Sequence, residues 1–85
     1  MIEFDYRITD ERGLHVQPVI ELFQYVKNSE CNVYIEKYGV IVKIDRIMEI
    51  VGLQIRKGDL VHIVISGDNE ETVYNYVKSY FQNNL

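Results

Sequence analysis

The sequence is poor in several features that particular protein classes require. It has 85 residues but one cysteine, Cys31, which cannot form an internal disulfide or a cysteine metal cluster. No apolar run approaches the roughly 20 residues that a membrane-spanning helix needs. The chain has nine lysines and arginines but thirteen aspartates and glutamates, which gives a net charge of −4. These shortages exclude a disulfide scaffold and membrane insertion, and they argue against a nucleic-acid partner.

Apolar residues are plentiful enough for one small core, at 47% of the chain. No linker, low-complexity tract or internal repeat interrupts the sequence, so we expect residues 1–85 to form one domain. The first residues alternate and carry acids, unlike a signal peptide, which predicts a cytoplasmic protein. A chain this short has room only for local chemistry carried by a few side chains.

Alternation of apolar and polar residues predicts four strands, at residues 2–8, 31–36, 40–44 and 60–65. In the strand at 40–44, we expect Val40, Val42 and Ile44 to share one side. His62 is expected on the open face of the sheet as a solvated residue. Metal binding there is disfavoured, because no second histidine or cysteine stands at motif spacing.

Apolar residues spaced by three and four predict a helix at residues 16–27. A short helix is expected after Asp45, its N-cap, and a last helix starts at Asp68 with Glu71 in a pattern like a capping box. The order β-α-β-β-α-β-α predicts an α+β fold. We expect an open-faced sandwich, with a four-stranded antiparallel sheet and three helices on one face.

His15 is the main candidate for chemistry, because it immediately precedes the first predicted helix. First-turn N–H groups lack intrahelical partners and the helix dipole is positive there, which makes an anion site. The same dipole disfavours an imidazolium cation, so the neutral nucleophilic imidazole is favoured. A histidine in this place is more often an ordinary polar loop residue, and the pattern alone leaves both interpretations open.

The segment from Gly13 to Pro18 resembles the active-site motif of the HPr family, the histidine-containing phosphocarriers of the bacterial sugar phosphotransferase system. Further parts of the resemblance are Ile47-Met48, Gly52-Leu53, Lys57-Gly58, and Ser66-Gly67 followed by Glu70. The resemblance spans the whole chain. It implies that Nδ1 of His15 accepts a phosphoryl group from enzyme I, which took it from phosphoenolpyruvate, and passes it to an enzyme IIA domain.

The resemblance also implies roles for other residues. Arg12 and the first-turn residues Val16 and Gln17 are expected to bind the phosphoryl group. The partner-docking patch is expected to consist of Val16, Ile20, Ile47, Met48 and Val51. Ile47 is expected to be partly buried and the other four more exposed. We expect a monomer without cofactor or metal, which carries the group and does not turn over substrate by itself.

The sequence departs from the family at two informative positions. Gln17 stands where family members generally have an arginine. A neutral amide therefore replaces a planar, positively charged guanidinium group that can bind two phosphate oxygens at once. Arg46 stands where many Gram-positive members have a regulatory serine, so phosphorylation by that route is expected to be absent. Gln24 and Glu49 further reduce the positive charge expected near His15, and Lys27 and Arg46 remain as the nearby bases.

Two alternatives to phosphoryl carriage remain. The chain could be a binding module of the same fold that regulates an enzyme or transcription factor through its docking patch. The loss of the arginine and the serine favours that hypothesis, whereas the presence of His15 opposes it. The second is nucleic-acid binding through the open face of the sheet. The acidic charge balance disfavours it, and it equally disfavours a stacking platform of tyrosines for single strands.

Overall fold

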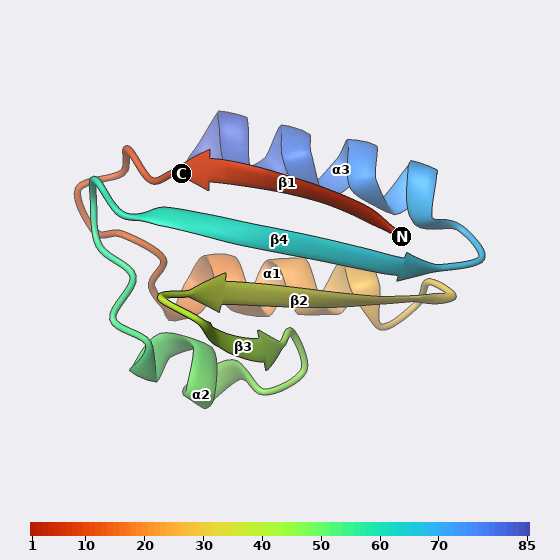
Figure 1. Cartoon of the computed structure of the whole chain (residues 1–85), viewed down its shortest axis with the longest axis horizontal. Helices are drawn as coiled ribbons and strands as arrows, with labels where there is room; N and C mark the ends of the chain where they lie inside the picture. The colour runs from red at the N-terminus through yellow and green to blue at the C-terminus, as the bar shows by residue number, and fades with distance from the viewer.

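The computed structural model describes all residues, 1–85, and its sheet follows directly from the alternating segments of the sequence. The elements in chain order are β1 (Ile2–Arg7), α1 (Val16–Val26), β2 (Cys31–Lys37), β3 (Val40–Lys43), α2 (Ile47–Gly52), β4 (Leu60–Gly67) and α3 (Glu70–Asn84). The four strands form one antiparallel sheet in the order β1-β4-β2-β3. In Figure 1, α1 and α3 lie behind this sheet, while α2 lies beside β3. The predicted α+β open-faced sandwich is confirmed.

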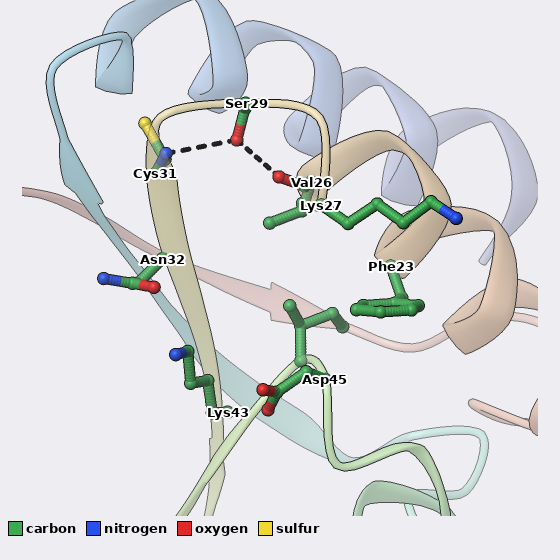
Figure 2. Close-up of a pocket in the computed structure, with 9 residues that line it drawn as sticks. Phe23, Val26, Lys27, Ser29, Cys31, Asn32, Lys43 and Asp45 are labelled. Atoms are coloured by element: carbon green, nitrogen blue, oxygen red, sulfur yellow. Dashed lines mark hydrogen bonds between the residues drawn. The ribbon is translucent and has the colours of Figure 1, made fainter.

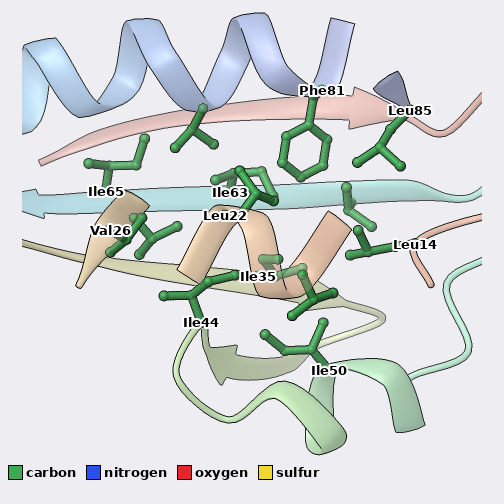
Figure 3. Close-up of a cluster of buried hydrophobic side chains, with 14 of the residues drawn as sticks. Leu14, Leu22, Val26, Ile35, Ile44, Ile50, Ile63, Ile65, Phe81 and Leu85 are labelled. Atoms are coloured by element: carbon green, nitrogen blue, oxygen red, sulfur yellow. The ribbon is translucent and has the colours of Figure 1, made fainter. Parts of the chain in front are cut away.

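The core lies between the sheet and the helices because each strand turns alternate residues, which are mostly apolar, to the same side. In the central register, Ile63 of β4 pairs with Phe4 of β1 and with Ile35 of β2. Leu22 of α1 and Phe81 of α3 cover this row, as Figure 3 shows. The buried residues include no polar or charged side chain. The hydrophobic effect therefore accounts for how α1 and α3 are fixed on the sheet.

Cys31 is buried at the start of β2, as its position in the alternating pattern predicts. Val40 and Val42 are two residues apart in β3 and so share a side, as predicted, but 52% of Val40 is exposed while Val42 is buried. Val40 pairs with Lys37 at the hairpin end of β3, the outermost strand of the sheet. An alternating pattern fixes which side a residue faces, whereas burial also requires a partner layer.

The first helix starts at Val16 as predicted, but the N-caps predicted for the second and third helices were wrong. The N-cap of α2 is Arg46, not Asp45, and its side chain makes no capping bond. The N-cap of α3 is Asn69, again without a side-chain bond, so Asp68 and Glu71 form no capping box. Glu70 instead accepts the Gly67 N–H at 3.2 Å and the N-terminal ammonium group at 2.8 Å. The physical reason is that neither N-cap residue has the extended backbone that directs a cap side chain at the first turn.

His62 lies on the open face of the sheet and is half-exposed, as predicted. Its two ring nitrogens each contact a carboxylate of the edge strand β1: Nδ1 lies 2.6 Å from Asp5 Oδ1, and Nε2 lies 2.6 Å from Glu3 Oε1. These contacts raise the pKa of His62, with the Asp5 hydrogen bond as the larger cause and the Glu3 hydrogen bond next.

No helix has the length and apolar character to span a bilayer.

Candidate functional site

The loop that carries His15 is held by backbone contacts with the segment before β4. Leu14 N–H donates to the carbonyl oxygen of Ile55 at 3.0 Å. The neighbouring residue, Gly13, has a φ of 65°, and a Cβ built on it lies 2.2 Å from the same carbonyl oxygen. Only glycine fits this conformation and this close approach. Gly13 therefore lets the loop pack directly on the Ile55 backbone and deliver His15 to the start of α1.

The C-terminal residue holds the other end of this loop. The backbone N–H groups of Thr9 and Asp10 donate to a terminal oxygen of Leu85, at 2.5 and 2.8 Å, and the Thr9 hydroxyl donates to it at 3.1 Å. The Leu85 side chain is buried in the core. The end of α3 is thus anchored beside the His15 loop, although the two lie at opposite ends of the sequence.

His15 is the N-cap residue of α1, with an extended backbone (φ −88°, ψ −177°) and a half-buried ring. Its Nδ1 lies 3.1 Å from the carbonyl oxygen of Gly13. A carbonyl oxygen can only accept, so in this arrangement Nδ1 carries the proton and donates. The neutral ring then has its lone pair on Nε2.

The first turn of α1 is suited to an anion. It contains no acidic residue, and His15 makes no side-chain capping bond to it. The N–H groups of Val16 and Gln17 have no partner within the helix, whereas Pro18 has no N–H. Two backbone donors beside the His15 ring are therefore available for phosphoryl oxygens.

A shallow pocket of about 170 Å³ adjoins His15. Its lining residues, which define the His15 pocket, are Arg12, His15, Gln17, Pro18, Glu21, Tyr80 and Asn84. The structure thus brings together three of the four residues predicted to contact a phosphoryl group: His15, Gln17 and Arg12. The fourth, Val16, does not line the pocket, and only its backbone N–H can take part from the first turn of α1.

Glu21 and Tyr80 line the same pocket and were missed at the sequence level. Gln17 Nε2 donates to Glu21 Oε2 at 3.0 Å, and the Tyr80 hydroxyl donates to Glu21 Oε1 at 2.5 Å. The hydrogen bond from Tyr80, followed by that from Gln17, lowers the pKa of Glu21. Burial, and then the bond to Glu21, raises the pKa of Tyr80. The four-residue spacing of Gln17 and Glu21 on a helix was a usable signal, whereas Tyr80 is 59 residues from Glu21 and gave none.

Arg12 is the only cationic side chain that lines the His15 pocket, and it is largely exposed. Its Nε lies 3.5 Å from Asp10 Oδ1, which also accepts the Arg12 backbone N–H at 2.8 Å. The hydrogen bond from the Arg12 backbone and, after it, the contact with the Arg12 side chain lower the pKa of Asp10. The guanidinium charge at the pocket is therefore partly offset by a neighbouring carboxylate.

The expected docking residues lie on α1 and α2, which pack against each other. Met48 and Val16 are 71% and 42% exposed, whereas Ile20, Ile47 and Val51 are half-buried. Ile47 thus has the expected partial burial, but Ile20 and Val51 share it instead of being clearly more exposed. Nη1 of Arg46 lies 2.6 Å from Oε1 of Glu49.

A larger pocket of about 280 Å³ lies away from His15, toward the end of α1 (Figure 2). Its wall includes Phe23 of α1 and the C-cap residue Lys27, together with Lys43 at the end of β3 and Asp45 in the segment that follows. Ser29 closes one side, where its hydroxyl donates to the Val26 carbonyl oxygen at 2.7 Å and accepts the Cys31 N–H at 3.2 Å. This pocket contains no histidine, so it is separate from the candidate site.

Comparison with known proteins identifies the class. A family model described as the PTS HPr component phosphorylation site matches residues 2–83. The chain therefore belongs to the HPr family of the phosphotransferase system, which confirms the resemblance seen in its sequence.

Individual relatives agree with this assignment. The chain is 25% identical over 83 residues to phosphocarrier protein HPr of Xylella fastidiosa strain Temecula1, covering 98% of this chain and 93% of the relative. The crystal structure of HPr from Bacillus anthracis superposes with a TM-score of 0.84 at 25% identity, covering 95% and 96% of the two chains. HPr-C-His from Thermoanaerobacter tengcongensis gives a TM-score of 0.88 at 25% identity, covering 98% and 93%.

Proposed function

We propose that this protein carries a phosphoryl group on Nδ1 of His15, taking it from enzyme I and passing it to an enzyme IIA domain. The observation that supports this most strongly is the position of His15 at the N-cap of α1. There it adjoins two unpaired backbone N–H groups and shares a pocket with Arg12 and Gln17. Family membership supplies the phosphotransferase system as the context.

Transfer requires a change in the hydrogen bonding of His15. Nδ1 must give up the proton that it donates to the Gly13 carbonyl oxygen, and Nε2 must take up a proton, so that the ring stays neutral with its lone pair on Nδ1. The Nδ1 lone pair then forms the bond to phosphorus while the bond from phosphorus to the donor breaks. The Gly13 carbonyl oxygen thus holds the resting ring in a form that must rearrange before attack.

The phosphoryl oxygens would then accept hydrogen bonds from the backbone N–H groups of Val16 and Gln17. Such charge-assisted bonds contribute about 1.5–3 kcal/mol each. The Gln17 amide adds a neutral donor, and Arg12 adds a positive charge that Asp10 partly offsets. This is a moderate degree of stabilisation, consistent with a group that must be passed on.

Enzyme I and enzyme IIA would dock on the apolar residues of α1 and α2 beside the His15 loop. Val16 and Met48 are exposed, and apolar side chains next to a reactive group suit a transient interface. Because Arg46 replaces the regulatory serine, control by phosphorylation at that position is expected to be absent.

The proposal is tested by phosphorylation of the purified protein with enzyme I, magnesium and phosphoenolpyruvate, followed by intact mass spectrometry. We expect one acid-labile phosphoryl group on the wild type and none on His15→Ala. The matched control is His62→Gln, which removes the other histidine and is expected to be labelled like the wild type. Labelling of His15→Ala would contradict the proposal.

The regulatory alternative makes a different prediction. If a known HPr is labelled under the same conditions and this protein is not, carriage from that enzyme I is contradicted. A partner outside the phosphotransferase system that binds wild type and His15→Ala equally would then support a binding module. The comparisons do not favour this alternative, because the curated relative is itself described as a phosphocarrier.

A further inference from the structure

Glu21 places a carboxylate in the wall of the His15 pocket, and both of its oxygens are engaged by neutral donors. Gln17 Nε2 donates to one oxygen at 3.0 Å and the Tyr80 hydroxyl donates to the other at 2.5 Å. These two bonds favour the ionised carboxylate without neutralising its charge. The pocket therefore contains a negative charge at Glu21, one helical turn after Gln17 on α1.

This arrangement acts against an anion on His15 in two ways. A phosphoryl group brings more negative charge into the pocket that already contains Glu21. In addition, the Gln17 side chain, which occupies the family's arginine position, directs its amide nitrogen at Glu21. One of its two N–H groups is therefore engaged with a carboxylate and not with the phosphoryl position.

The position of Glu21 is set by α3 as well as by α1. The ring of Tyr80 is partly buried against the core. Its centroid lies 6.3 Å from the ring centroid of Tyr76. The Tyr76 ring in turn stacks on the ring of Tyr25 of α1, with 3.6 Å between the two centroids. These packed rings fix the Tyr80 hydroxyl where it meets Glu21. The carboxylate of Glu21 is thus held in place by hydrogen bonds from Gln17 and Tyr80.

We propose that Glu21 is a positioning residue that raises the free energy of the phosphoryl group on His15, by retaining the Gln17 amide and by repelling the phosphoryl charge. The inference rests on the proposed function and deepens it. Its consequence is a carrier that releases its phosphoryl group readily to an acceptor. Glu21 is exposed to solvent, so water screens its charge and the effect is moderate.

The test is an equilibrium competition between wild type and Glu21→Gln. Equal amounts of isotopically labelled wild type and unlabelled variant are mixed with catalytic enzyme I and a limiting amount of phosphoenolpyruvate. Enzyme I transfers phosphoryl groups between the two carriers, and intact mass spectrometry gives the phosphorylated fraction of each. A change in docking alters only the time to equilibrium, whereas a change in phosphoryl stability alters the final ratio.

We expect Glu21→Gln to hold about two- to fivefold more phosphoryl groups than the wild type, the range expected for one exposed charge. The matched control is Glu30→Gln, which makes the same charge change at an exposed residue beyond the end of α1 and outside the His15 pocket. It should give a ratio of one.

An equal or smaller phosphorylated fraction of Glu21→Gln would overturn the inference while leaving His15 as the acceptor. A shift of the same size in Glu30→Gln would also overturn it, because net charge would then explain the effect. Failure of both proteins to take up phosphoryl groups would instead overturn the proposed function itself.

Discussion

The α-carbon of Gly13 lies so close to Ile55 that a Cβ on it meets the Ile55 carbonyl oxygen at 2.2 Å and the Arg56 α-carbon at 2.9 Å. The same carbonyl oxygen accepts the N–H of Leu14. The loop before α1 is therefore packed backbone to backbone against the segment before β4. This contact connects the stability of the fold to the placement of His15.

Gly13→Ala is expected to lower the free energy of unfolding by about 3 kcal/mol, because it combines a positive φ with a backbone clash. Gly39→Ala is the matched control, since Gly39 also has a positive φ (84°) but nothing within 4 Å of its Cβ position. It should cost only about 1 kcal/mol. Urea unfolding measures both. Equal losses of unfolding free energy in the two variants would show that the close contact with Ile55 adds nothing to the cost of the positive φ.

Gln17→Arg restores the charge that the family generally has, but at a position four residues before Glu21. We expect the new guanidinium to pair with Glu21, so that the single change lengthens the phosphohistidine lifetime by about threefold or less. The double change Gln17→Arg with Glu21→Gln should lengthen it by more than the product of the two single effects. The decay of isolated phosphoprotein, followed by mass spectrometry, gives these lifetimes. Strictly multiplicative effects would contradict coupling between residues 17 and 21.

His62 is expected to make stability dependent on pH. Its pKa is raised in the folded state above the ordinary value of 6.5, first by the Asp5 hydrogen bond and then by that of Glu3. Because the folded protein binds this proton more tightly than the unfolded chain does, the contribution is complete below about pH 6.5 and is lost as the pH rises through the folded-state pKa. Glu36, which pairs with His62 from β2, is a third acid beside it.

His62→Gln should therefore be less stable than the wild type at pH 6, by about 1 kcal/mol or less because the contacts are partly exposed. The difference should shrink as the pH rises above the raised pKa. Urea unfolding at several pH values checks this, with Asp5→Asn as a second variant that removes the larger cause. A stability difference that grew with pH would contradict the assignment.

Met48 and Ile50 allow docking and folding to be separated within α2. Met48 is 71% exposed, whereas Ile50 is fully buried. Met48→Ala should change the free energy of unfolding by less than about 0.5 kcal/mol and raise the enzyme I KM for this protein. Ile50→Ala should destabilise the fold by about 2–5 kcal/mol through loss of burial and a cavity. An unchanged KM for Met48→Ala would remove Met48 from the docking patch.

Local pattern was enough to predict the strands and the first helix, and it marked His15 as a candidate whose role as acceptor came from the family resemblance. Alternation along β1 and β4 reflects one buried face, and spacings of three and four along α1 reflect one buried stripe. His15 could be singled out because a helix start has the same unpaired N–H groups wherever it occurs. Local pattern failed at the N-caps Asp45 and Asp68, where the outcome depends on backbone angles. It also gave no sign that Val40 is exposed, because burial depends on the layer that covers the sheet.

The sequence determined which segments form strands and helices, which of their faces are apolar, and that His15 stands at a helix start, since these follow from interactions within a few residues. Only the tertiary structure decided which groups meet across the chain. It brings Tyr80 of α3 to Glu21 of α1, and the carboxylates of β1 to His62 of β4. Such pairs depend on strand register and on helix packing, which are set by the core as a whole and leave no signal in the local sequence.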